Sequence, residues 1–239
     1  MEIDGRLIGP GENLEHVDLS NTDLRGANLE GANLQNSILS KSNLKGVNLS
    51  GSNLSWADLT DTNLSSSDLT GAFLRGSMLK NSNLERATLI GADLTGAHME
   101  ETCLVSADFT NAILTGASLW MALVSSMGYT VPFEVLGPNG ESVLDPSPES
   151  CGANFTNADL RGTNLEELNM PGPAFGWIND GAKFIKANLT DANVSEAFLS
   201  DCDFSGANLT GVNLHEADYG ISCWIGDKDT IWPEGFQDI

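Results

Sequence analysis

Few side chains in this sequence of 239 residues could bind a metal ion or act as a nucleophile. They are three histidines and four cysteines, at His16, His98, His215, Cys103, Cys151, Cys202 and Cys223. The histidines lie far apart in the sequence, and no two cysteines have the CxxC spacing of a zinc site. No glycine-rich segment ends in Lys-Ser or Lys-Thr, as a phosphate-binding loop would. We therefore expect no metal, no cofactor and no enzymatic activity.

The composition is strongly acidic, with 33 acidic and 11 basic side chains and a formal net charge of −22. Binding to nucleic-acid phosphates or to an anionic membrane needs clustered Lys and Arg, so we expect neither. No apolar run reaches the roughly 18 residues of a membrane span, and the first residues carry no signal-peptide pattern. Scattered cysteines fit a reducing compartment, so we expect a cytoplasmic protein.

A five-residue repeat organises the chain. From Leu14 to Leu119 a large apolar residue recurs at every fifth position, 22 times in one register. A small residue such as Ala27 lies two positions before it, and Asn or Asp usually lies directly before it. An amphipathic helix repeats about every 3.6 residues and a strand about every two, so neither element explains the pattern.

A period of five predicts a chain that turns after every repeat. If each repeat forms one side of a square, about 20 residues complete a coil, and the coils stack at about 4.8 Å, the spacing of β-strands. The large and the small residues then point inward, and they are buried only against neighbouring coils. The leucines expected in this core include Leu24, Leu44, Leu64, Leu84, Leu104, Leu189 and Leu209.

The repeat has the form A-(D/N)-L-x-x, as in Ala27-Asn28-Leu29, Ala32-Asn33-Leu34 and Ala207-Asn208-Leu209. This pattern resembles that of the pentapeptide-repeat family. The resemblance implies an all-β fold, a right-handed quadrilateral β-helix of about eight coils with two insertions.

Interruptions of the repeat divide what we expect to be one continuous domain. The expected segments are a lead-in at 1–11, repeats at 12–120, an insertion at 121–152, repeats at 153–170, a short loop at 171–181, repeats at 182–220 and a C-terminal cap at 221–239. Two short apolar strands around Pro138-Asn139-Gly140 predict a β-hairpin in the first insertion. Loops held by a rigid scaffold often carry function, so both insertions are candidate binding elements.

The function that we favour is a non-enzymatic scaffold that binds a protein partner through a face of the rod or through the 121–152 insertion. Exposed aromatic side chains would mark its interface, and the candidates are Trp56, Phe73, Phe133, Trp177 and Phe198, together with Asn139 in the hairpin turn. The N-terminal edge of the first coil has no evident cap, so a second copy could also stack there.

The alternative is an acidic mimic of DNA. Within the pentapeptide-repeat family, the quinolone-resistance proteins occupy the DNA site of a type II topoisomerase, and the resemblance implies this role for a chain with two interruptions and an excess of acid. Residues 120–239 contain 18 acidic and 4 basic side chains. The candidate contacts are Asp191, Glu196, Asp201, Asp203, Glu216 and Asp218. The sequence departs from that subgroup in its longer first insertion and in lacking an amphipathic C-terminal helix.

Overall fold

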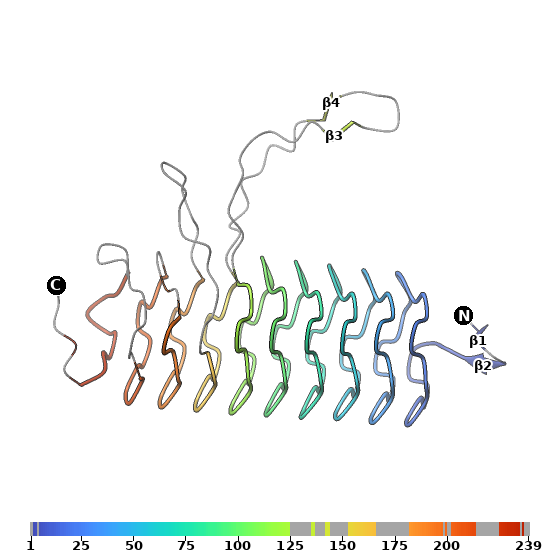
Figure 1. Ribbon diagram of the computed structural model, residues 1–239, viewed down its shortest axis with the longest axis horizontal. Coiled ribbons are helices and arrows are strands. Elements are labelled where there is room, and N and C mark those ends of the chain that lie inside the picture. The colour runs from blue at the N-terminus through green and yellow to red at the C-terminus, as the bar shows by residue number, and fades with distance from the viewer. Residues whose placement is uncertain are drawn as a thin grey trace.

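The computed structural model describes residues 2–3, 5–124, 135–136, 142–143, 153–165, 182–197, 199, 202–213, 225–234 and 236. They form a rod of stacked coils with the two termini at opposite ends (Figure 1). At the N-terminal end β1 (Glu2–Ile3) pairs antiparallel with β2 (Arg6–Leu7). A second antiparallel pair, β3 (Val135–Leu136) and β4 (Ser142–Val143), flanks in sequence the Pro-Asn-Gly segment where we expect a hairpin turn.

Each coil has four sides, and each side contributes one parallel bridge to the coil before it and one to the coil after it. In the uninterrupted part the paired residues are 20 positions apart, so that Asn13 pairs with Asn33 and Asn33 with Asn53. We name the four sides by their bridging residues. Face A carries Asn13, Asn33, Asn53, Phe73, Asp93, Ile113, Asp159, Asn188 and Asn208; face B carries Asp18, Ile38, Asp58, Met78, His98, Ser118, Asn164, Asn193 and Asn213; face C carries Asp23, Asn43, Asn63, Asn83, Cys103 and Leu123; face D carries Asn28, Asn48, Asp68, Thr88, Asp108, Asn154, Lys183 and Asp203.

The corners between faces are tight turns that need a left-handed residue. In the first coil Val17 donates its N–H to the Leu14 carbonyl at 3.2 Å, and His16 between them has a φ of 59°. The same corner position has a positive φ throughout the repeats, as in Gly26 and Asn36. A turn of this kind requires a positive φ at its third residue, which glycine and asparagine tolerate best.

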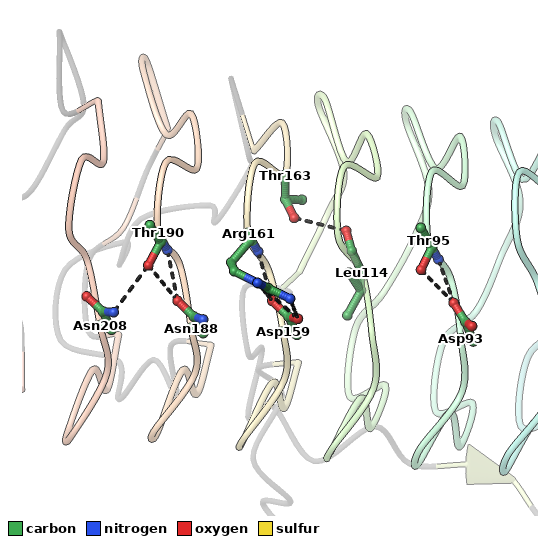
Figure 2. A network of polar contacts seen from close by, with 9 residues as sticks. All are labelled: Asp93, Thr95, Leu114, Asp159, Arg161, Thr163, Asn188, Thr190 and Asn208. Atoms are coloured by element: carbon green, nitrogen blue, oxygen red, sulfur yellow. Dashed lines mark hydrogen bonds and ion pairs between the residues drawn. The ribbon is translucent and has the colours of Figure 1, made fainter.

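The Asn or Asp before each leucine has a structural role. Its side-chain oxygen accepts the backbone N–H two residues later: the Ser20 N–H donates to Asp18 at 2.9 Å, and the Glu30 N–H donates to Asn28 at 3.0 Å. Figure 2 shows this contact on face A, where Thr190 donates to Asn188 at 3.2 Å. An unpaired amide at a tight corner costs stability, so the turn selects these two residue types.

The interior consists of the large and small inward residues. Every leucine expected in the core is buried, namely Leu24, Leu44, Leu64, Leu84, Leu104, Leu189 and Leu209. Small residues such as Ala57 and Ser52 are buried beside them, and the Ser52 hydroxyl donates to the Leu49 carbonyl at 2.7 Å. The core is therefore a stack of aliphatic layers in which the small positions leave room for the leucines.

Both insertions interrupt the sequence while the stack of coils continues. The offset between bridged residues grows from 20 to 46 at Asp108–Asn154 and to 29 at Asn164–Asn193, so 26 and nine residues are added to a coil. The first coil to be interrupted runs to Val124, four residues beyond the expected boundary at 120. Val124 is buried and accepts the Ala153 N–H at 2.8 Å, so the core position is filled before the chain leaves the rod.

A column of aromatic rings crosses both interruptions. Phe109, Phe155, Phe184 and Phe204 stack inside face D with ring centroids 4.9, 5.2 and 5.0 Å apart. At the C-terminal end Trp232 meets Phe204 edge-on at 6.3 Å and stacks on Phe236 at 4.6 Å. Trp232 thus covers the last ring of the column, within the segment where we expect a cap.

Replacing Phe155 by alanine should lower the free energy of unfolding by about 3–5 kcal/mol, because the substitution leaves a cavity between two stacked rings. Phe73, an exposed phenylalanine on face A, provides the matched control, and Phe73→Ala should change stability by less than about 0.5 kcal/mol. Urea unfolding followed by circular dichroism measures both. Equal losses in the two variants would contradict the stacked core.

Candidate protein-interaction surface

The structure separates the acidic side chains that the sequence singled out. Asp191 is exposed at the corner between faces A and B, and Glu196 is exposed at the corner between faces B and C. Asp203 lies on face D, where its carboxylate accepts the Ser205 N–H at 2.9 Å. These three residues therefore point to different sides of the rod. Asp201, Glu216, Asp218, Phe133, Asn139 and Trp177 lie outside the described residues, as does Phe198.

Negative charge on the described coils is sparse. Residues 5–124, 153–165, 182–197 and 202–213 together contain 17 acidic and 10 basic side chains, a difference of −7. Spread over about 40 Å of stacked coils, that is about one net charge per 6 Å, against about one per 1.7 Å of duplex DNA. Of the 18 acidic residues in 120–239, 11 lie outside the described residues.

Exposed apolar side chains gather at one corner of the rod. Ile38 (41% exposed), Trp56 (62%), Phe73 (51%) and Met78 (44%) belong to three consecutive coils at the junction of faces A and B, and we call them the apolar edge. Phe73 and Met78 lie on either side of the corner glycine Gly76. The indole of Trp56, from the preceding coil, covers Gly76 so closely that a Cβ there would overlap the ring.

Trp56 has an unfavourable backbone conformation for its residue type. Its φ is 61°, in the left-handed region where a bulky L-residue is an outlier, whereas the next corner in the same column is Gly76. The neighbouring glycine leaves space for the indole to lie across the corner. Every described corner of the repeats has a positive φ, so exposure distinguishes Trp56: with 62% of its surface exposed it is the leading candidate on this surface.

A shallow depression adjoins the apolar edge on face A. It has a volume of about 480 Å³, and Gly31, Gly51, Asn33, Asn53, Phe73 and Arg75 contribute to its lining. The asparagines form a flat floor in which Asn33 donates to Asn13 at 3.0 Å and Asn53 donates to Gln35 at 3.1 Å. Phe73 replaces the next asparagine of this column, so its ring stands at one end of the floor.

Arg75 is held beside the depression by Asp93 of the next coil. The Arg75 Nε donates to the Asp93 carboxylate at 2.6 Å, and the Thr95 hydroxyl donates to the same carboxylate at 2.7 Å, as Figure 2 shows for Thr95. Burial of Asp93 would raise its pKa, but the hydrogen bonds from Thr95 and Arg75 outweigh that effect and lower the pKa below its ordinary value. The ion pair fixes the direction of an otherwise flexible arginine.

The described side chains that could act as nucleophiles or metal ligands do not lie together. His16 and His98 are exposed, on different coils, and His215 lies outside the described residues. Burial raises the pKa of the Cys103 thiol, which a hydrogen bond to Val105 only partly offsets. Cys202 is buried at an inward position. Among the described residues no three His, Cys, Asp or Glu side chains lie together as metal ligands, and no helix is long and apolar enough to cross a membrane.

The sequence pointed to Trp56 and Phe73 and missed Ile38, Met78 and Arg75. A signal for the first two was present, because Phe73 occupies a bridging position where Asn or Asp is the rule and Trp56 occupies a corner position where glycine or a polar residue is the rule. Arg75 follows its leucine as many other polar residues do, and only its pairing with Asp93 distinguishes it.

The family model for pentapeptide repeats matches the chain in eight copies, over residues 13–51, 27–65, 57–96, 92–122, 151–172 and 182–218. The chain belongs to the pentapeptide-repeat family. Its fold is the right-handed quadrilateral β-helix of that family, as the sequence predicted. A search of curated proteins finds no match.

Several solved structures of pentapeptide-repeat proteins resemble this chain. QnrB1, a plasmid-mediated fluoroquinolone resistance protein, is 16% identical over 92% of this chain and 91% of its own, with a TM-score of 0.38. HetL, involved in heterocyst differentiation regulation in the cyanobacterium Nostoc sp. strain PCC 7120, is 26% identical over 93% and 92%, with a TM-score of 0.28. Rfr23 from the cyanobacterium Cyanothece 51142 is 30% identical over 46% and 88%, with a TM-score of 0.27. None of these scores supports a transfer of function to this pentapeptide-repeat protein.

Asp93→Asn should destabilise the pentapeptide-repeat protein by about 1 kcal/mol at neutral pH, because it removes the charge that pairs with Arg75. The pKa of Asp93 in the folded state lies below its unfolded value of about 3.9, so the ionised carboxylate stabilises the fold above that pH. This contribution is lost as the pH falls through the folded-state pKa. The gap between the variant and the wild type should therefore close as the pH falls below the unfolded value and through the folded-state pKa. Urea unfolding from about pH 2.5 to 7 measures it.

Asp58→Asn is the control for this pH series, because asparagine already occupies the equivalent bridging positions Asn53 and Asn63 on faces A and C of the same coil. It should change stability by less than about 0.5 kcal/mol at neutral pH. If the Asp93→Asn gap stayed constant down to acid pH, the carboxylate charge would not be its cause.

Proposed function

We propose that this protein is a non-enzymatic interaction scaffold that binds a protein partner through the apolar edge. The observation that carries the proposal is the Trp56 indole, which is 62% exposed yet held across Gly76. Members of the pentapeptide-repeat family are generally structural or interaction proteins, which agrees with this role.

The composition of the apolar edge matches that of binding hot spots. Tryptophan and arginine are enriched among the residues that dominate interface energies, and Trp56 and Arg75 lie on adjoining coils here. Contiguous exposed apolar patches are uncommon on monomeric soluble proteins and often mark interaction sites. Burying an exposed indole and a phenyl ring against a partner would release a large apolar area from water.

The 121–152 insertion is a second candidate surface within the same proposal. Its ends are rigidly placed, because Val124 and Ala153 are buried and hydrogen-bonded to each other. Lys183, which follows the end of the second insertion, donates its N–H to the Ala153 carbonyl at 2.9 Å. Both insertions therefore return to the rod at stacked positions of face D.

Charge placement gives the DNA-mimic alternative less support. The described coils hold 17 acidic and 10 basic side chains, and many of the aspartates on the bridging positions accept a backbone N–H of their own turn. Their positions thus follow from the needs of the coil. An electrostatic mimic would instead present carboxylates in a continuous track on one side.

The test is affinity capture from bacterial lysate with the full chain, Trp56→Ala, and a variant that lacks 125–152. We expect Trp56→Ala to reduce the captured partner by at least about tenfold, as for a central aromatic hot spot. Met121→Ala is the matched control for the apolar edge, since Met121 is 42% exposed at the corner between faces B and C, where the insertion begins, and its loss should not affect a partner bound at the apolar edge. Capture that persists in Trp56→Ala and disappears in the deletion would place the interface in the insertion.

A salt series separates the scaffold from the mimic. Binding through apolar side chains should not weaken between about 50 and 500 mM NaCl, because salt screens only charge interactions. The combined variant Asp191→Asn, Glu196→Gln, Asp203→Asn should also retain the partner. A partner that is lost at moderate salt and lost in that triple variant would overturn the scaffold proposal in favour of DNA mimicry.

A further inference from the structure

We infer that the partner of the apolar edge is a second copy of this chain, joined by a two-fold axis that places each Trp56 in the face A depression of the other copy. This inference rests on the proposed function, since it identifies the occupant of the same surface. In this dimer the indole contacts Phe73 and Arg75 of the opposite chain.

Shape is the first argument. One chain carries both an exposed indole, which lies across Gly76 and forms a low ridge at the corner of faces A and B, and an open depression of about 480 Å³ on face A. Ser55, the residue before Trp56, contributes to the lining of that depression, so the ridge and the hollow lie side by side. A two-fold contact requires one patch that is complementary to itself, and an adjoining ridge and hollow on the same chain meet that requirement. A two-fold contact also closes the assembly at two copies, so that no binding site is left open.

Charge is the second argument. The whole chain has a net charge of −22, but residues 31–80, which contain the apolar edge, hold four basic and three acidic side chains. The bases are Lys41, Lys45, Arg75 and Lys80, and the acids are Asp58, Asp61 and Asp68. Two copies of so acidic a rod repel each other, and the repulsion is weakest where the local charge is close to zero. The apolar edge lies in that stretch.

The chemistry of the depression suits an indole. Phe73 stands at one end of the asparagine floor with 51% of its surface exposed, and aromatic rings pair favourably in offset or edge-on arrangements. Arg75 lies beside it, held by its 2.6 Å contact to Asp93, and a guanidinium group attracts the face of a tryptophan ring. Because Asp93 already orients Arg75, little side-chain entropy remains to be lost on binding.

Sedimentation equilibrium of the full-length protein tests the inference. The apolar edge is small, so we expect a dimer with a dissociation constant of about 1–100 μM, and the samples should span about 5–500 μM. Raising NaCl from about 50 to 500 mM should strengthen the dimer several-fold, because it screens the repulsion between two acidic rods. A cationic partner at this surface would show the opposite dependence on salt.

We expect Trp56→Ala and Phe73→Ala each to raise the dissociation constant of the dimer about tenfold. The double variant should lose less binding free energy than the two single variants together, because the two side chains contact each other across the axis. Met121→Ala should leave the dissociation constant unchanged. Circular dichroism and urea unfolding confirm that each variant is folded, which is expected because all three side chains are exposed.

A chain that stays monomeric up to about 500 μM at high salt would overturn the inference. A dimer insensitive to Trp56→Ala and Phe73→Ala would also overturn it and would move the contact elsewhere, for example to the N-terminal coil edge. If the chain is monomeric but capture of a different protein depends on Trp56, the dimer is wrong while the proposed function stands. If neither dimerisation nor capture depends on Trp56, both fail.

Discussion

Stacking of successive coils is the constraint on which the rest of the structure depends. Apart from the turn bond at each corner, the backbone of each side forms hydrogen bonds with the coils before and after it, as the Leu14 N–H does with Asn33 and the Asn33 N–H with Glu12, so the β-bridge sets the spacing between coils. At that spacing the interior holds one large and one small residue per side. Each coil of such a solenoid buries its inward residues only against the neighbouring coils. The end of the stack therefore needs a cover, and Trp232 provides one at the C-terminal end.

Turning the chain at every fifth residue has a conformational cost that the repeat offsets locally. Corner residues adopt a positive φ, including bulky ones such as Trp56 and Met121, and the Asn or Asp before each leucine satisfies the amide that the corner leaves unpaired. The insertions are tolerated because the stacking on both sides of them is kept. The chain leaves the rod only after Val124 has filled its inward position, and the phenylalanine column restores tight packing where it returns.

These structural requirements leave few positions free for function. Inward residues serve the core, and most Asn and Asp at bridging positions serve the turns, so a high acidic content does not by itself create an electrostatic surface. Departures from the rule are therefore more informative than agreement with it. Ile38, Phe73 and Met78 replace Asn or Asp at bridging positions, and Trp56 replaces glycine or a small polar residue at a corner. Their convergence on one edge in three consecutive coils is the basis of the binding surface that we propose.

The sequence by itself determined the period, the inward leucines and the family, because a strict repeat of five with a small residue at a fixed offset fits neither a helix nor a strand and has the pattern of the pentapeptide-repeat family. It also identified Trp56 and Phe73 as outward aromatics. Only the tertiary structure decided which outward residues share a side, because residues that are close in space lie 17 to 20 positions apart and each one-residue shift moves a side chain from a face to a corner. That geometry placed Asp191, Glu196 and Asp203 on different sides of the rod and brought Ile38, Trp56, Phe73 and Met78 together.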